Sequence, residues 1–156
     1  MFSVRGGTHV LLNNIFLAPR TALMGTMDDA LFMVVQRDAR DQYMARRMEG
    51  AHSGDYPVES FVRLIKRNRA GFVAIRNAAP PDRLEEQMML MRFEDFVRDP
   101  ALRERVLQRA GLDAEGLVPD PSRFDPAVSA RNIGIHRAGL APEEIAQIEA
   151  IGIYLP

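Results

Sequence analysis

The stretch Val34-Val-Gln-Arg-Asp-Ala-Arg-Asp-Gln-Tyr-Met-Ala45 decides the fold that the sequence predicts. It overlaps the apolar run Ala30-Leu-Phe-Met-Val-Val35, which is typical of a strand buried in a parallel sheet. Good helix formers follow over residues 39–49. In an open α/β sheet, ligands bind off the carboxyl ends of the strands. We therefore expect Arg37 and Arg40 to lie at the edge of the sheet where a ligand would bind.

The remainder of the chain alternates between strand and helix patterns. Apolar runs predict two further strands, at Thr8–Asn14 and within Gln87–Phe93. Apolar residues at helical spacing predict three further helices, which cover 57–75, 99–111 and 142–151. Residues 113–130 contain three prolines and are expected to be irregular. This alternation predicts one α/β domain over residues 1–156, with a mainly parallel sheet.

Composition excludes several classes of site and partner. The chain has 156 residues and a formal net charge of −1, so no overall field favours nucleic acid or an anionic membrane. It has no cysteine, which excludes disulfides, thiolate metal sites and thiol catalysis. His9, His52 and His136 lie far apart in sequence, so we expect no metal. Since the longest apolar run is too short to span a bilayer and no signal peptide is apparent, a soluble, cytoplasmic protein is expected.

The two arginines after the strand suit an anionic ligand. Guanidinium groups bind phosphate with planar, directional hydrogen bonds, and the following helix start would add free N–H donors and the positive end of a dipole. A purely structural interpretation is also open, in which Arg37–Asp41 and Asp38–Arg40 pair with each other and cap the helix.

The apolar strand followed by Arg-Asp-x-Arg-Asp-x-Tyr at residues 37–43 resembles the 3′-phosphate-binding strand and helix of sulfotransferases that use 3′-phosphoadenosine 5′-phosphosulfate (PAPS). Three other stretches are similar to this family in the same order, namely Val10–Asn14, Met91–Pro100, and Ser129–Gly134 with His136-Arg137 after it. The resemblance covers nearly the whole chain. It implies a three-layer, P-loop-like α/β fold with a parallel sheet, N-terminally incomplete.

The resemblance also implies a site for the PAPS donor, or for adenosine 3′,5′-bisphosphate, without a metal. Five residues would form it: Arg37, Arg40, Arg131, Asn132 and Arg137. Arg37 would contact the 3′-phosphate, whereas Arg40 could instead pair with Asp41 or Glu94. The last three residues could close over the same phosphate or form a solvated polar loop. The catalytic base and the acceptor, a hydroxyl or an amine, are unknown.

The sequence departs from the family's pattern at two places. The residue eight positions after Arg37 is Ala45, where the family has a serine that contacts the 3′-phosphate. No loop for the 5′-phosphosulfate is recognisable, because the only lysine, Lys66, lies in a helical stretch. Arg5-Gly6-Gly7-Thr8 resembles such a loop only superficially, since no strand precedes it.

Two functions stay open from the sequence. The chain is either an incomplete or inactive sulfotransferase that retains the 3′-phosphate half-site, or a non-catalytic nucleotide-binding or interaction module of the same fold. A missing first strand would expose apolar sheet surface and favour pairing with another chain. We therefore expect a homo-oligomer or a partner chain that covers the sheet.

Overall fold

The computed structural model describes residues 31–50, 56–78, 80–112 and 120–154. The strand predicted at Thr8–Asn14 lies outside these residues, and so do His9, His52 and the Arg5–Thr8 stretch.

Two strands form where the apolar runs predict them. β1 spans Phe32–Gln36 and β2 spans Met88–Arg92. They pair in parallel, with Phe32 opposite Met88 and Gln36 opposite Arg92. Parallel neighbours need a long crossover connection, which here contains three helices. The parallel pairing agrees with the sequence prediction and places the carboxyl ends of both strands at one edge.

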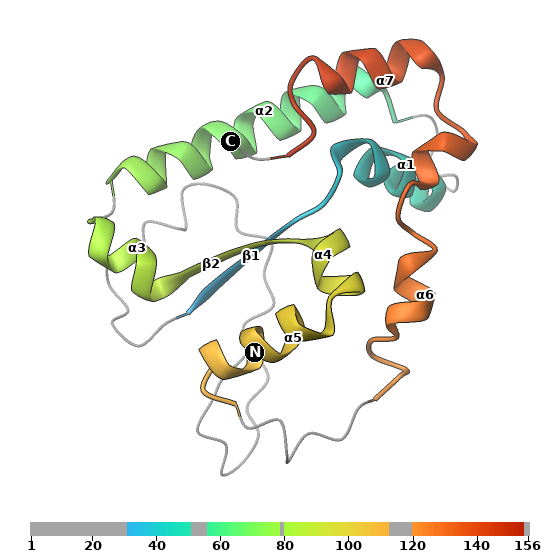
Figure 1. Cartoon of the computed structure of the whole chain (residues 1–156). Helices are drawn as coiled ribbons and strands as arrows, with labels where there is room; N and C mark the ends of the chain where they lie inside the picture. Colours follow the sequence, from blue (N-terminus) through green and yellow to red (C-terminus); the bar gives the residue numbers. More distant parts are fainter. Residues whose placement is uncertain (1–30, 51–55, 79, 113–119, 155–156) are drawn as a thin grey trace.

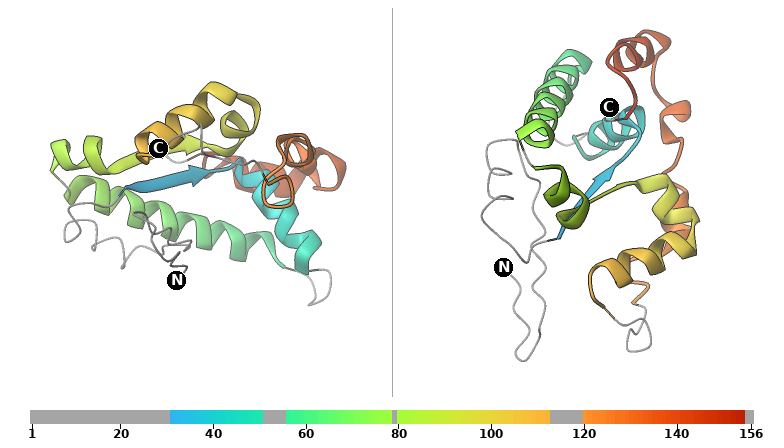
Figure 2. Two further views of the ribbon diagram at one scale, coloured as in Figure 1. Left: turned by 90° about the horizontal axis from the view of Figure 1, so that it is seen from below. Right: turned by 60° about the vertical axis from the view of Figure 1, so that its left-hand side comes forward.

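Helices lie on both sides of the strand pair. They are α1 (Ala39–Gly50), α2 (Val58–Ala78), α3 (Pro81–Gln87), α4 (Phe93–Arg98), α5 (Pro100–Arg109), α6 (Pro126–Ala130) and α7 (Pro142–Glu149), with a 3-10 helix, η2, at Ile135–Ala138. Figure 1 shows α2 and α7 running along one side of the strands, and in the left view of Figure 2 the strands lie between α2 and α5. None of these helices is both long and apolar enough to cross a bilayer. The layering agrees with an α/β arrangement, while the P-loop-like family fold stays a prediction.

Local sequence signals fix several helix ends. Asp99 caps α5 by accepting a hydrogen bond from the Ala101 N–H, and Gly111 adopts a left-handed φ of 67° just after the helix, as the sequence predicts. Asp125 caps α6 in the same way, with Pro126 in the first turn. The prediction of irregular chain is therefore wrong for residues 126–130, because this Asp-Pro pair starts a helix instead of a turn.

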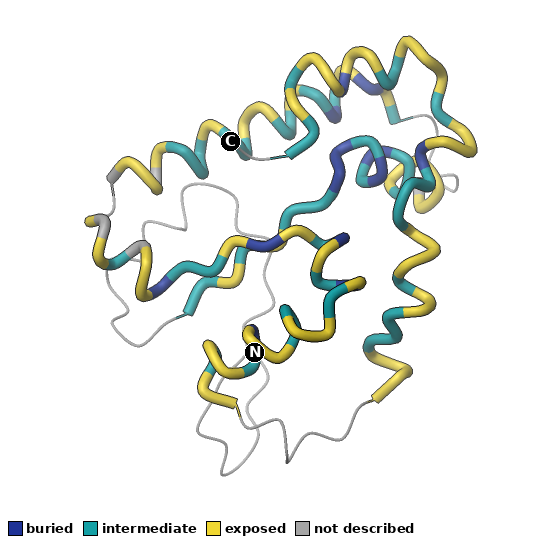
Figure 3. The backbone as a smooth tube through the Cα atoms, in the orientation of Figure 1, coloured by how far each residue is buried: buried dark blue, intermediate teal, exposed yellow. Residues whose placement is uncertain are grey.

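The main core joins α1, α2 and α7. Its buried residues are Ala39, Tyr43, Val58, Phe61 and Ile148. The Tyr43 and Phe61 rings lie 5.2 Å apart, and Figure 3 shows buried positions gathered where β1 runs into α1. Tyr43 is buried in this core, whereas Met48 of the same helix is 60% exposed.

The strand pair keeps apolar side chains in contact with solvent. Met33 and Val35 of β1 are 38% and 55% exposed, and Leu90 of β2 is 44% exposed. Met33 and Val35 are two residues apart and so share one face of the sheet, whereas Leu90 pairs with Val34 on the other face. Both faces of the strand pair therefore retain exposed apolar surface.

Replacing Phe61 with alanine should lower the free energy of unfolding by about 3–5 kcal/mol, because the ring is fully buried and its loss leaves a cavity. Chemical denaturation followed by circular dichroism measures this change. Lys66→Ala, at an exposed position of the same helix, is the matched control and should change stability by less than about 0.5 kcal/mol. Similar losses in both variants would show that the core does not centre on Phe61.

Candidate functional site

The start of α1 lies directly beyond the carboxyl end of β1. Its first backbone N–H groups already donate hydrogen bonds within the protein. The Asp38 carboxylate accepts from the Arg40 backbone N–H at 2.9 Å, and the Ala39 N–H donates to the Ile153 carbonyl at 3.2 Å. The Asp38 N–H donates to Glu94 at 2.9 Å. The expectation that this helix start offers free N–H donors to a phosphate is thus wrong for Ala39 and Arg40.

Arg40 is bound to two carboxylates. Its guanidinium lies 2.6 Å from Asp38 Oδ2 and 2.7 Å from Glu149 Oε1. The hydrogen bond with Asp38 is the main reason that the pKa of Arg40 is raised. The interpretation in which Asp38 pairs with Arg40 matches this geometry. Asp41 and Glu94, the other partners considered for Arg40, form no ion pair with it among the described residues. Three of the five N–H donors of Arg40 are thus used by carboxylates, and a ligand there would compete with two charged partners.

The Asp38 carboxyl group is held in its charged form. Burial by itself raises the pKa of Asp38, but hydrogen bonds from the Arg40 side chain and backbone outweigh it. The pKa is therefore lowered from 3.8. Stability from this group is present above that value and is lost as the pH falls through the lowered pKa.

Arg37 differs from Arg40 in having no acidic partner among the described residues. Its Nη2 donates to the Asn132 carbonyl at 2.6 Å, and its guanidinium carbon lies 5.2 Å from the centre of the Phe93 ring. Its Nε is buried and makes no hydrogen bond with the described part of the chain. Among the described residues, no carboxylate forms an ion pair with Arg37. Its positive charge at the sheet edge therefore lacks a protein counter-ion within this part of the chain.

The loop at residues 131–137, called the late loop below, contacts Arg37 through Asn132 among the described residues. Arg131, Asn132 and Arg137 are exposed, and neither arginine side chain hydrogen bonds to another described residue. Gly134 has a left-handed φ of 82°, and a Cβ there would lie 3.9 Å from the Arg137 guanidinium. Arg137 thus folds back over its own loop. The structure joins two of the five predicted residues, Arg37 and Asn132, by a direct contact.

Sequence reasoning missed the contact that holds this loop. Asp41 in α1 is 1% exposed, and its carboxylate accepts from the Gly134 N–H at 2.7 Å and the His136 N–H at 3.1 Å. His136 Nδ1 lies 2.5 Å from Asp41 Oδ1. The 95 residues between Asp41 and His136 leave no spacing signal that could reveal the pair.

Asp38, Asp41 and His136 also bring three possible metal ligands together. Their ligand atoms all lie within 4.8 Å of one another, and all three residues are buried. The carboxylates already accept hydrogen bonds from Arg40 and from the late loop. A cation would have to replace these bonds, and we assign no metal to the group.

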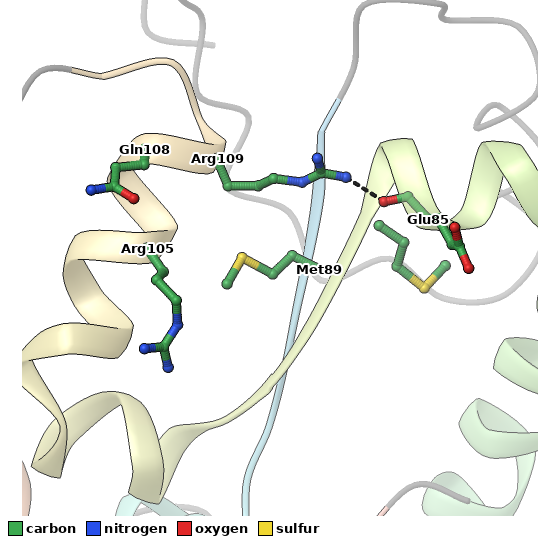
Figure 4. Close-up of a pocket in the computed structure, with 6 residues that line it drawn as sticks. Glu85, Met89, Arg105, Gln108 and Arg109 are labelled. Atoms are coloured by element: carbon green, nitrogen blue, oxygen red, sulfur yellow. Dashed lines mark hydrogen bonds between the residues drawn. The ribbon is translucent and has the colours of Figure 1, made fainter.

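A shallow pocket of 460 Å³ lies away from Arg37. It is lined by Glu85, Met88, Met89, Arg105, Gln108 and Arg109. Figure 4 shows Met89 extending from β2 between α5 and α3, with Arg109 donating to the Glu85 carbonyl. Met88 and Met89 begin β2, so the pocket lies at the amino ends of the strands. It includes none of the predicted site residues.

Comparison of the chain with protein-family models, curated proteins and solved structures found no match. The resemblance to sulfotransferases therefore stays a prediction, and the geometry around Arg37 carries the functional argument.

Arg40→Ala should lower the free energy of unfolding at neutral pH by about 1–3 kcal/mol, less than for a fully buried pair because water reaches Arg40. The difference from wild type should shrink as the pH falls below 3.8, because protonated Asp38 no longer needs a cation. Urea unfolding across this range measures it.

The matched control is Arg105→Ala, whose exposed pair with Asp99 spans 3.5 Å and should contribute about 0–1 kcal/mol. A difference between Arg40→Ala and wild type that does not change with pH would contradict the assigned role of Asp38.

Proposed function

We propose that the chain is a sulfotransferase-like α/β protein that binds a 3′-phosphorylated adenosine nucleotide through Arg37 and the late loop. The loop that grips the 5′-phosphosulfate in the family is not recognisable in the sequence, and Ala45 replaces the family's serine. The proposal is therefore confined to the 3′-phosphate half-site, with binding of adenosine 3′,5′-bisphosphate or PAPS as the expected activity.

One contact carries this proposal, the hydrogen bond between Arg37 and the Asn132 carbonyl. Both residues belong to segments that the resemblance assigns to the 3′-phosphate, although they lie 95 residues apart. A fold that brings them within 2.6 Å supports a common site. Arg37 also follows the carboxyl end of a parallel strand, and α/β proteins bind ligands at such ends.

The charge of Arg37 supports the same conclusion. A carbonyl is a weaker partner for guanidinium than a carboxylate or a phosphate, because only the latter two add full charge to the hydrogen bond. A phosphate could therefore replace the Asn132 carbonyl at Arg37 without separating an ion pair. The same replacement at Arg40 would break its contacts with Asp38 and Glu149. Arg37 is the residue most suited to the ligand.

Arg37→Ala should weaken the binding of adenosine 3′,5′-bisphosphate roughly tenfold or more, because a charge-assisted hydrogen bond is lost. Arg37→Lys keeps the charge but not the planar fork, and should lie between wild type and alanine. Isothermal titration calorimetry measures all three affinities.

Arg63→Ala is the matched control, since Arg63 is an exposed arginine on α2 bonded only to Ser60 among described residues. It should bind as wild type does. Equal affinity of Arg37→Ala and wild type would remove Arg37 from the site, and a wild-type chain without affinity would refute the proposed function.

An interaction module of the same fold is the second candidate, and the exposed strand residues favour it. Val35 is 55% exposed although it lies within β1, and Met33 beside it on the same face is 38% exposed. An exposed apolar sheet face in water favours packing against another apolar surface. The partner that we propose for this face is a second copy of the chain.

Sedimentation at increasing protein concentration should show wild-type dimers, and Val35→Lys should shift the chain towards monomer, because a charge on this face opposes burial. Val128→Lys is the matched control, as Val128 is 52% exposed but lies on α6. Monomeric wild type at every concentration, or equal effects of both lysines, would exclude this surface.

A further inference from the structure

We infer that Asp41 and His136 are positioning residues for the proposed nucleotide site, and that the Nδ1–H donor of His136 is the feature on which this depends. The inference rests on the proposed function. It concerns how the late loop is held beside Arg37. Neither Asp41 nor His136 needs to touch the ligand for this role.

The geometry shows how the loop is fixed. The Asp41 carboxylate receives three donors from one short segment, the N–H of Gly134, the N–H of His136 and the ring of His136. Asp41 is 1% and His136 is 5% exposed, so water cannot readily replace these bonds. Leaving a buried carboxylate without partners is costly. The loop is thereby attached to the first turn of α1.

This attachment determines where Asn132 lies. Asn132 is two residues before Gly134, and its carbonyl reaches Arg37, which is four residues before Asp41. Arg37 and Asp41 therefore hold two nearby parts of the loop, Asn132 and the segment that begins at Gly134. The Arg37 contact is the exposed one of the two, and the Asp41 contact is the buried one.

A bound ligand would affect the Arg37 contact with the loop but not the Asp41 contact. A phosphate at Arg37 would compete with the Asn132 carbonyl for the guanidinium, which would weaken one attachment of the loop. The Asp41 contact would then keep the loop, with its exposed Arg131 and Arg137, beside the ligand. If that contact is broken, only part of the molecules hold the loop in place, and apparent affinity falls by the same fraction.

Two substitutions of His136 separate hydrogen bonding from packing. The amide nitrogen of asparagine occupies the place of Nδ1 on histidine, whereas that of glutamine occupies the place of Nε2. His136→Asn should therefore keep the bond to Asp41 and lose affinity for adenosine 3′,5′-bisphosphate by about threefold or less. His136→Gln should lose about tenfold. A role in packing alone predicts the opposite order, because asparagine leaves the larger cavity.

Val106→Ala controls for general loss of stability. Val106 is buried in α5, outside the site, and the variant should keep wild-type affinity under conditions where it is fully folded. Urea unfolding of each variant establishes those conditions. Equal affinity of the asparagine and glutamine variants, or a loss in Val106→Ala as large as in His136→Gln, would overturn the inference.

Hydrogen exchange tests the attachment without any nucleotide. The amide protons of Gly134 and His136 should be protected in wild type and in His136→Asn, and should exchange about tenfold faster in His136→Gln, where the loop opens more often. If wild type fails to bind the nucleotide, the proposed function is refuted, and this exchange pattern still decides the role of the pair. Unprotected amides in wild type, or equal protection in all three proteins, would overturn it.

Discussion

The buried carboxylate of Asp41 is the interaction on which the arrangement of the site depends. A buried charge is stable in a protein only when it is paired and hydrogen bonded, and Asp41 meets this requirement with three donors from residues 134–136. All of them come from a segment far away in sequence. The chain cannot bury the first turn of α1 in this way without bringing the late loop against it. The positions of Asn132 and Gly134 follow from that constraint.

Arg37 and Arg40, the two arginines after β1, have different partners in the structure. Arg40 is bound by Asp38 and Glu149, and so ties the start of α1 to α7. Arg37 lies beside Phe93 and a carbonyl, and its charge is not compensated by a described carboxylate. One motif thus contains both an arginine held in ion pairs and an arginine without a described acidic partner. The difference could arise only from tertiary contacts.

Local features were predictable because local physics determines them. The apolar runs before Gln36 and Arg92 predicted both described strands. Asp99-Pro100 and Gly111 likewise predicted where α5 begins and ends. Contacts across long sequence separations were not predictable in this way. Glu149 was not recognised as a partner of Arg40, and the Asp41–His136 pair was missed, because neither leaves a spacing pattern. Residues 113–130 were expected to be irregular because of their prolines, although an Asp-Pro pair such as Asp125-Pro126 also starts helices.

The chemistry at the sheet edge differs from that of a helix that binds an anion with its N-terminus. In such sites the free backbone N–H groups and the dipole bind the ligand. Here the side chain of Asp38 and the carbonyl of Ile153 accept the N–H groups of Arg40 and Ala39, and Asp38 adds a negative charge at the helix start. Any anion at this edge must therefore be bound mainly by guanidinium groups. Arg37 lies at this edge, and the loop held by Asp41 carries two exposed arginines, Arg131 and Arg137.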